Sequence, residues 1–296
     1  MDDVTGRRGL DGLLGLRLRR RASIAWSASG DSPQVVAHRG SSEKKAEHTL
    51  AAYVEAMDEG AEALECDVRL TADGHLVCMH DRRIERTSNG RGAVSTLELQ
   101  QLEELDWESW KQPWPRLDDD TVAPDPRGSS ILTLERLLDT VRDYDRRVEV
   151  AIETKHPTRF AGLVERRLVE LLDRYGWARP RRGTTSPARI MSFSWMSLRR
   201  CLELAPTLQT VYLMDRVPLR FRDGSLPLGA SAAGPSIEII RAHPEYVAKV
   251  HRTGNQVHVW TVNNPVDVEL CAALGVDAVI TDKPGNTLQQ LSERTA

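Results

Sequence analysis

Short apolar runs alternate along the chain with longer segments in which apolar residues recur every three or four positions. The first pattern is typical of buried strands and the second of amphipathic helices. A helix is predicted to begin at Thr49, because Leu50, Val54 and Met57 follow at helical spacing. Such alternation predicts a parallel sheet covered by helices. Three later pairs of strand and helix have the same order: 148–153 and 160–175, 189–193 and 196–204, 256–260 and 266–274.

Charged residues stand at the ends of several apolar runs. Glu65 and Asp67 end one predicted strand, and side chains two residues apart on a strand point to the same face. These two carboxylates are therefore predicted to point together, while Cys66 faces the other way. By the same rule, Glu153 and Lys155 share one face at the end of a later strand.

The carboxylates of Glu65, Asp67 and Glu153 predict a metal site. Because no Cys or His stands at ligand spacing beside them, the pattern favours a hard, oxygen-preferring cation, Mg²⁺ or Ca²⁺, over zinc. The pattern does not choose between these two ions.

Two histidines follow apolar runs in the same way. His38 and His80 are candidates for a base and an acid, since imidazole exchanges protons near neutral pH. Arg39 offers a bidentate fork to a phosphate, and Lys155 offers a compact point charge. Together with a divalent ion, these groups would offset the charge of a phosphodiester.

Each feature alone has an ordinary structural explanation. A single His at a strand end is usually structural, and paired charges such as Glu65 with Asp67 are often surface salt bridges. The polar clusters all follow apolar runs, however, and barrel enzymes collect their catalytic residues at the carboxyl ends of strands. Their shared placement favours a functional site.

The ordered set of motifs from about Val35 to Pro284 resembles the glycerophosphodiester phosphodiesterase family. Each motif is short, but their order along the chain is specific. The matching segments are Val36-Ala37-His38-Arg39-Gly40, Glu47-His48-Thr49, Glu65-Cys66-Asp67-Val68, Asp73-Gly74, His80-Asp81, Arg86-Thr87, Ile152-Glu153-Thr154-Lys155, Ser192-Phe193, Val259-Trp260-Thr261-Val262-Asn263 and the closing residues 275–284.

The resemblance implies a (β/α)8 TIM barrel that hydrolyses a glycerophosphodiester to glycerol 3-phosphate and an alcohol. It implies that His38 and His80 are the general acid and base, in an order that stays open. The remaining implied roles are metal ligands for Glu65, Asp67 and Glu153, phosphate binding for Arg39 and Lys155, the pocket lining for Glu47, and packing against the alcohol portion of the substrate for Trp260.

Three positions leave alternatives open. His48 stands where the family pattern usually has Asn, which bears on the hydrogen bonding of the first loop. Trp260 either faces the pocket or packs among its valine neighbours. Asp81 either orients His80 or caps the following loop.

The length of 296 residues fits one barrel domain, residues 34–296, with an insertion at about 81–145 after the second strand region. The insertion is either a lid that shapes the substrate site or a surface excursion whose Trp residues form a satellite core. Residues 216–235, rich in Gly, Pro and Ser, are predicted to form a barrel loop of unknown role.

Residues 1–33 lie outside the resemblance and are predicted to form a flexible, Arg-containing tail. This segment lacks the uninterrupted apolar core of a secretory signal, and no run approaches the length of a membrane span, so the cytoplasm is the predicted location. The tail could still touch an anionic membrane surface weakly through its Arg and Leu residues.

Composition adds little to this picture. A net charge of −3 gives no indication of a nucleic-acid surface. The four cysteines are scattered through apolar elements, so they are predicted to be small buried side chains rather than disulfide or zinc partners. No pattern predicts an oligomeric state.

Three functions fit the sequence. The first is metal-dependent hydrolysis of a small-molecule glycerophosphodiester, with water or a neighbouring glycerol hydroxyl as nucleophile. The second is a phospholipase D-type enzyme of the same scaffold that cleaves lysophospholipids and holds the acyl chain against the Trp-rich insertion. The third is a barrel that binds phosphate esters without turnover.

Overall fold

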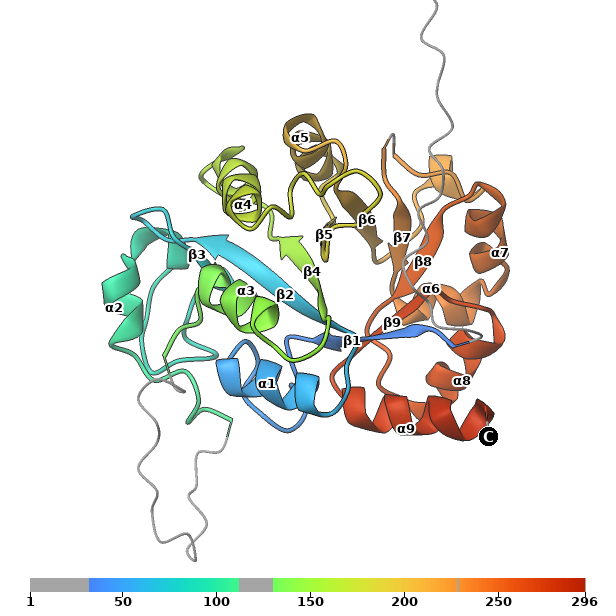
Figure 1. Ribbon diagram of the computed structural model, residues 1–296, viewed down its shortest axis with the longest axis horizontal. Helices are drawn as coiled ribbons and strands as arrows, with labels where there is room; N and C mark the ends of the chain where they lie inside the picture. Colours follow the sequence, from blue (N-terminus) through green and yellow to red (C-terminus); the bar gives the residue numbers. More distant parts are fainter. Residues whose placement is uncertain (1–31, 112–129, 228, 296) are drawn as a thin grey trace, which may run out of the picture.

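The computed structural model describes residues 32–111, 130–227 and 229–295. Its parallel strands form a closed ring, because β1 pairs with β9 on one side and with β2 on the other (Figure 1). Strand β3 is antiparallel to β2 and lies outside the ring. The prediction of a (β/α)8 TIM barrel is confirmed. The strands are β1 (Gln34–His38), β2 (Ala63–Leu70), β3 (Leu76–Cys78), β4 (Glu149–Thr154), β5 (Ala188–Ser192), β6 (Gln209–Met214), β7 (Ala232–Pro235), β8 (Gln256–Val259) and β9 (Ala278–Thr281).

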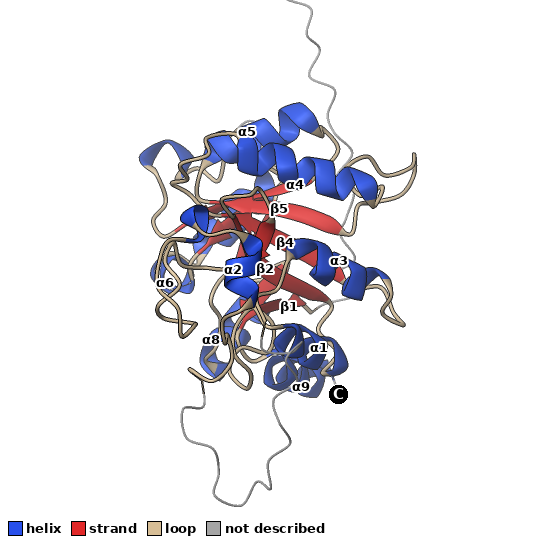
Figure 2. Ribbon diagram, turned by 90° about the vertical axis from the view of Figure 1, so that its left-hand side faces the viewer, coloured by secondary structure: helices blue, strands red, loops and turns tan. Residues whose placement is uncertain are grey.

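Helices cover the outside of the ring. In Figure 2, α4 and α5 lie on one side of the strands, and α1, α8 and α9 lie on the other. Helix α1 begins where the sequence predicts, because the Thr49 hydroxyl caps it by accepting a hydrogen bond from the Ala52 amide. The helices are α1 (Leu50–Asp58), α2 (Leu99–Glu103), α3 (Leu134–Arg142), α4 (Leu163–Arg174), α5 (Trp195–Leu204), α6 (Ile237–Ala242), α7 (Glu245–Arg252), α8 (Pro265–Ala273) and α9 (Pro284–Thr295), with 3₁₀ turns η1 (Val94–Thr96) and η2 (Leu219–Phe221).

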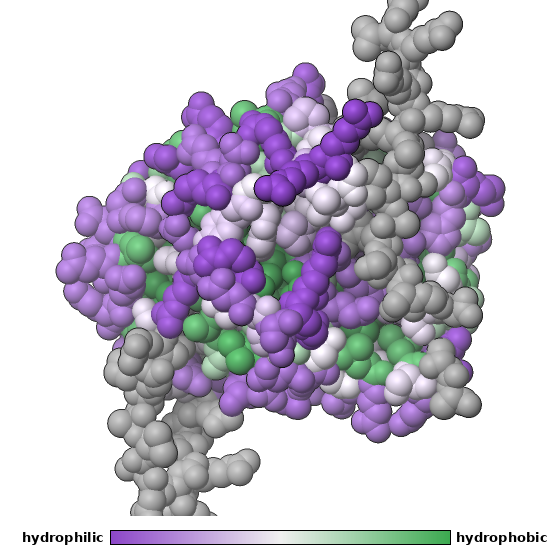
Figure 3. Space-filling view, viewed as in Figure 1, coloured by the Kyte–Doolittle hydropathy of each residue, from purple (hydrophilic) through white to green (hydrophobic). Residues whose placement is uncertain are grey.

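Strand alternation divides the side chains between two layers. Outward-facing residues such as Cys66 and Ile152 join the main core between strands and helices, and small residues such as Ala63 and Ala151 fill the inside of the ring. All four cysteines are free and buried, as the sequence predicts. The face seen in Figure 3 is mainly hydrophilic, with apolar side chains in small patches.

Part of the segment 81–145 leaves the ring. Ile84 and Trp107 are buried in a separate apolar cluster beside β3, whereas α3 packs into the main core. Trp114 lies outside the described residues, as does the segment 1–31. No helix among the described residues is long and apolar enough to cross a membrane.

The prediction of a loop for residues 216–235 is wrong at its carboxyl end, where β7 pairs with β6 and β8 in the ring. This strand contains Gly234 and Pro235, which are depleted in strands. Gly234 is required by close packing, because a Cβ atom there would lie 2.7 Å from Cδ2 of Leu213. The composition that makes this segment look like a loop is what allows it to fit beside β6.

Ile152→Ala is expected to lower the free energy of unfolding by about 2–5 kcal/mol, because Ile152 is fully buried on the outer face of β4. Urea denaturation measures this loss. In the control, Val266→Ala, the side chain is 73% exposed, and a change within about 0.5 kcal/mol is expected. Equal losses in the two variants would contradict the packing described for β4.

Candidate active site

Strand register brings the three predicted metal ligands together where the middle of β2 lies beside the carboxyl end of β4. Asp67 is the parallel partner of Glu153, and Glu65 lies two residues before Asp67 on the same face. One oxygen from each of the three carboxylates lies within 4.8 Å of the others, and all three residues are buried. Glu65 and Asp67 therefore point to the same face, as the two-residue period of a strand predicts.

The electrostatics of this cluster are those of crowded, buried acids. Burial, followed by repulsion from Asp67, raises the pKa of Glu65 well above its ordinary value and that of Glu153 to about 8. Burial opposes ionisation of Asp67 too, but hydrogen bonding from His48 and the charge of Lys155 outweigh it, and the pKa of Asp67 is lowered. Three close oxygen donors with this excess of negative charge suit a hard divalent cation.

Two cations flank the cluster. Nζ of Lys155 lies 2.9 Å from Oε1 of Glu153 and 3.2 Å from Oδ1 of Asp67. Arg39 follows β1, and its Nε lies 3.1 Å from Oδ2 of Asp67 without a hydrogen bond of suitable angle. Both residues lie where a phosphate beside the carboxylates would meet them.

His38 is oriented by Asp282, a residue without a predicted role. Nδ1 of His38 lies 2.7 Å from Oδ1 of Asp282, and its Nε2 lies 4.0 Å from Oε2 of Glu65. Burial raises the pKa of Asp282, but the hydrogen bond and charge of His38 outweigh this effect, so the pKa is lowered. Asn263 and Ser42 also donate to Asp282. Asp282 therefore holds the Nδ1 side of the ring and leaves Nε2 for chemistry.

His80 has a similar arrangement. Its Nδ1 lies 2.7 Å from Oδ1 of Asp81, so Asp81 orients His80, as one of its two possible roles predicts. Arg86 donates to the other carboxylate oxygen of Asp81. Burial lowers the pKa of His80. The charge of Asp67 raises this pKa and the charge of Arg39 lowers it, so the ring lies within electrostatic range of the carboxylate cluster.

Glu47 is held between two arginines. Its Oε1 lies 3.0 Å from Nη1 of Arg39, and both of its oxygens accept hydrogen bonds from Arg86. Burial opposes ionisation of Glu47, but the bonds from Arg86 and the charge of Arg39 lower its pKa to about 2. Glu47 therefore fixes the side chain of Arg39 next to Asp67.

His48, the departure from the family pattern, contacts the carboxylate cluster directly. Its Nε2 lies 3.0 Å from Oδ2 of Asp67, and its Nδ1 lies 2.8 Å from the hydroxyl of Tyr53. The backbone of His48 has a φ of 62°, a region that Asn and His tolerate better than most residues. His48 thus satisfies the same backbone requirement as Asn and adds a buried bond to Asp67.

Trp260 lies apart from these charges, on an apolar part of the barrel mouth. Its ring is 5.3 Å from that of Phe193 in an edge-on contact, so residues following β8 and β5 meet across the mouth. Its Nε1 donates to the carbonyl of Gly234. Phe193 and Trp195 are exposed. We call Phe193 and Trp195, which follow β5, the apolar rim.

Comparisons with known proteins agree with this geometry. The chain is 42% identical over 268 residues to a protein of Mycobacterium tuberculosis named "Probable glycerophosphodiester phosphodiesterase 1", covering 89% of this chain and 94% of that protein. It is 32% identical to the glycerophosphodiester phosphodiesterase of Bacillus subtilis, with 86% and 85% covered.

Solved structures share the fold. A phosphodiesterase of Oleispira antarctica in complex with the product sn-glycerol-3-phosphate superposes with a TM-score of 0.73 at 24% identity, over 88% of this chain and 97% of that one. A glycerophosphodiester phosphodiesterase of Parabacteroides distasonis gives a TM-score of 0.71 at 25% identity, over 90% and 99%. Residues 38–286 match the family model and carry the site described above, so the chain belongs to the glycerophosphoryl diester phosphodiesterase family.

Proposed function

We propose that this phosphoric diester hydrolase cleaves glycerophosphodiesters to glycerol 3-phosphate and an alcohol, with a divalent cation held by Glu65, Asp67 and Glu153. One observation carries the proposal. Strand register places three buried carboxylates beside two cations, within reach of two histidines that are each bonded to an aspartate. The names of the relatives support the same reaction.

The cation that suits this oxygen-only site is Mg²⁺ or Ca²⁺. When bound, it neutralises negative charge on the phosphate oxygens and favours attack at phosphorus. Arg39 and Lys155 add positive charge on the same side. The Nε of Arg39, buried and without a hydrogen bond in the described structure, has a free proton for a phosphate oxygen.

The histidines divide the proton transfers. His80 is assigned as the general base, because burial lowers its pKa and so favours the neutral ring that accepts a proton. His38, held by Asp282, then protonates the leaving alcohol from Nε2. The base activates either water or the neighbouring glycerol hydroxyl, and the second route forms a cyclic phosphate. Trapping that cyclic ester during slow turnover would support the second route.

The test of function is release of glycerol 3-phosphate from glycerophosphocholine and glycerophosphoethanolamine with Mg²⁺, Ca²⁺ or EDTA. Release with one of the metals and its loss in EDTA are expected. Turnover of either ester would eliminate a binding-only barrel. Absence of release with both metals would reject the proposed reaction.

The apolar rim favours one second candidate, cleavage of lysophospholipids. Exposed Phe193, which contacts Trp260, offers an apolar surface for the acyl chain that a deacylated glycerophosphodiester lacks. Lysophosphatidylcholine in the same assay separates the two reactions. If the enzyme cleaves the lysolipid and leaves glycerophosphocholine intact, lysophospholipid cleavage becomes the leading function.

The cytoplasm is the proposed location. Four free, buried cysteines agree with a reducing compartment, in which disulfides are rare. The expected weak contact of the tail with a membrane falls on residues outside the described part of the chain and stays a prediction.

A further inference from the structure

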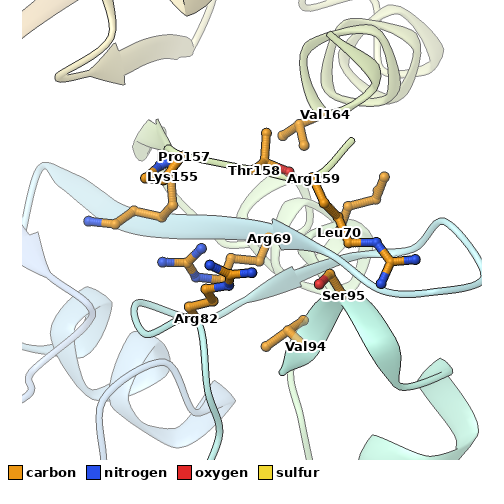
Figure 4. A pocket seen from close by; sticks show the side chains of 10 residues that line it. All are labelled: Arg69, Leu70, Arg82, Val94, Ser95, Lys155, Pro157, Thr158, Arg159 and Val164. Atoms are coloured by element: carbon orange, nitrogen blue, oxygen red, sulfur yellow. The ribbon is translucent and has the colours of Figure 1, made fainter. Parts of the chain in front are cut away.

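A second, shallow concave site lies beside the carboxylate cluster (Figure 4). It is formed by the end of β2, the segment after β3, η1 and the loop after β4. Lys155 belongs to both sites, because its Nζ contacts Asp67 and Glu153 while its side chain lines the pocket.

The pocket concentrates positive charge. Besides Lys155, it is lined by Arg69, Arg82 and Arg159, and in the described part of the chain no carboxylate lies within 4.0 Å of these three guanidinium groups. Arg86 provides a contrast, since both Asp81 and Glu47 neutralise it. A cleft lined by one sign of charge attracts the opposite sign.

Arg69 is held in place at the back of this pocket. Its Nε and Nη2 donate to the carbonyl of His80 at 2.9 and 2.6 Å. Burial lowers the pKa of Arg69, and this effect outweighs the opposing charges of Asp67, Asp81 and Glu153. An anion in the pocket would add a favourable charge beside Arg69 and Arg82. A fixed guanidinium is preorganised for such a ligand, because little side-chain freedom is lost on binding.

The other lining groups also suit a phosphate. Ser95 and Thr158 offer hydroxyl donors, and Leu70, Val94 and Val164 line the rest of the site with apolar groups. Phosphate monoesters bind where several guanidinium, ammonium and hydroxyl donors converge. The pocket has this donor set, and the proposed chemistry uses only Lys155 of it.

We propose that the pocket is a subsite for a second phosphate carried by the alcohol arm of the substrate, an inference that rests on the proposed phosphodiesterase function. A diester held by its phosphate at Lys155 extends two arms. When the alcohol is phosphorylated, that arm enters the pocket lined by Arg82 and Arg159 instead of packing against Trp260. The preferred substrates are then glycerophosphodiesters with a phosphorylated alcohol.

The test compares glycerophosphoglycerol with its terminally phosphorylated form, which differs by one phosphate. The wild type is expected to have a kcat/KM about tenfold or more higher for the phosphorylated ester, since tenfold corresponds to one charge-assisted contact of about 1.4 kcal/mol. The double variant Arg82→Gln with Arg159→Gln should lose this preference. Arg252→Gln is the matched control, because this exposed arginine ends α7, before β8 at the other end of the barrel.

Several outcomes would overturn the inference. Equal rates for the two esters in the wild type, or a preference that survives in the double variant, would show that the pocket does not read the second phosphate. Hydrolysis of neither ester would instead remove the proposed function on which the inference depends. Adding inorganic phosphate tests whether the pocket binds a free anion instead of part of the substrate. If it raises kcat for the unphosphorylated ester, the pocket is an activator site and not a substrate subsite.

Discussion

Glu153→Gln is expected to lower kcat/KM for glycerophosphocholine by about 10³-fold or more. The substitution keeps the size of the side chain and removes one of three charged oxygen ligands from the proposed cation site. Charge stabilisation by a bound metal contributes several kcal/mol to a transition state, and about 4 kcal/mol corresponds to 10³ in rate. Kinetics with saturating Mg²⁺ or Ca²⁺ measure the rate, and calorimetric titration of either ion measures the loss of metal binding.

Glu149→Gln is the matched control for this prediction. Glu149 lies four residues earlier on β4, where its carboxylate accepts a hydrogen bond from Gln34 at 2.7 Å at the other end of the strand. A glutamine can still accept that bond, so activity and metal binding should stay within a few-fold of wild type. Equal losses in both variants would show that any buried charge on β4 matters and would contradict a metal site at Glu153.

Much of this site follows from strand period alone. Side chains alternate along a strand, so the spacing of Glu65 with Asp67 and of Glu153 with Lys155 predicts two pairs that share a face. The parallel register then sets Asp67 beside Glu153. Local sequence predicts these groups well because their neighbours in space are also near in sequence or lie on adjacent strands.

Partners that are distant in sequence could not be predicted in this way. Asp282 bonds to His38 across 244 positions, and Arg86 bonds to Glu47 across 39. Both residues stand within matching motifs, but nothing in the local pattern pairs them with a particular side chain. His48 was identifiable only as a departure, since its bond to Asp67 depends on a backbone with positive φ. Tertiary packing, and for His38 and Asp282 the pairing of β1 with β9, determines these contacts.

His38→Ala and His80→Ala are each expected to lower kcat for glycerophosphocholine by about 10³-fold, within the 10²–10⁴ range of general acid and base catalysis. The losses of kcat in the two variants should differ on an ester whose leaving group is p-nitrophenol. Because nitrophenolate leaves without a proton, loss of the acid should cost less than about tenfold there. With His38 as the acid, His38→Ala recovers on the aryl ester and His80→Ala does not.

The pH profile gives an independent check of this assignment. A base must be neutral, so kcat/KM falls as pH drops through the pKa of His80. Burial lowers that pKa below its ordinary value of 6.5, which places the acid limb below pH 6.5 in the wild type. Asp81 favours the protonated ring, so Asp81→Asn should move the limb to still lower pH while reducing the maximal rate. Recovery of His80→Ala on the aryl ester would reverse the two roles, because only the residue that protonates the leaving group becomes dispensable when no proton is needed.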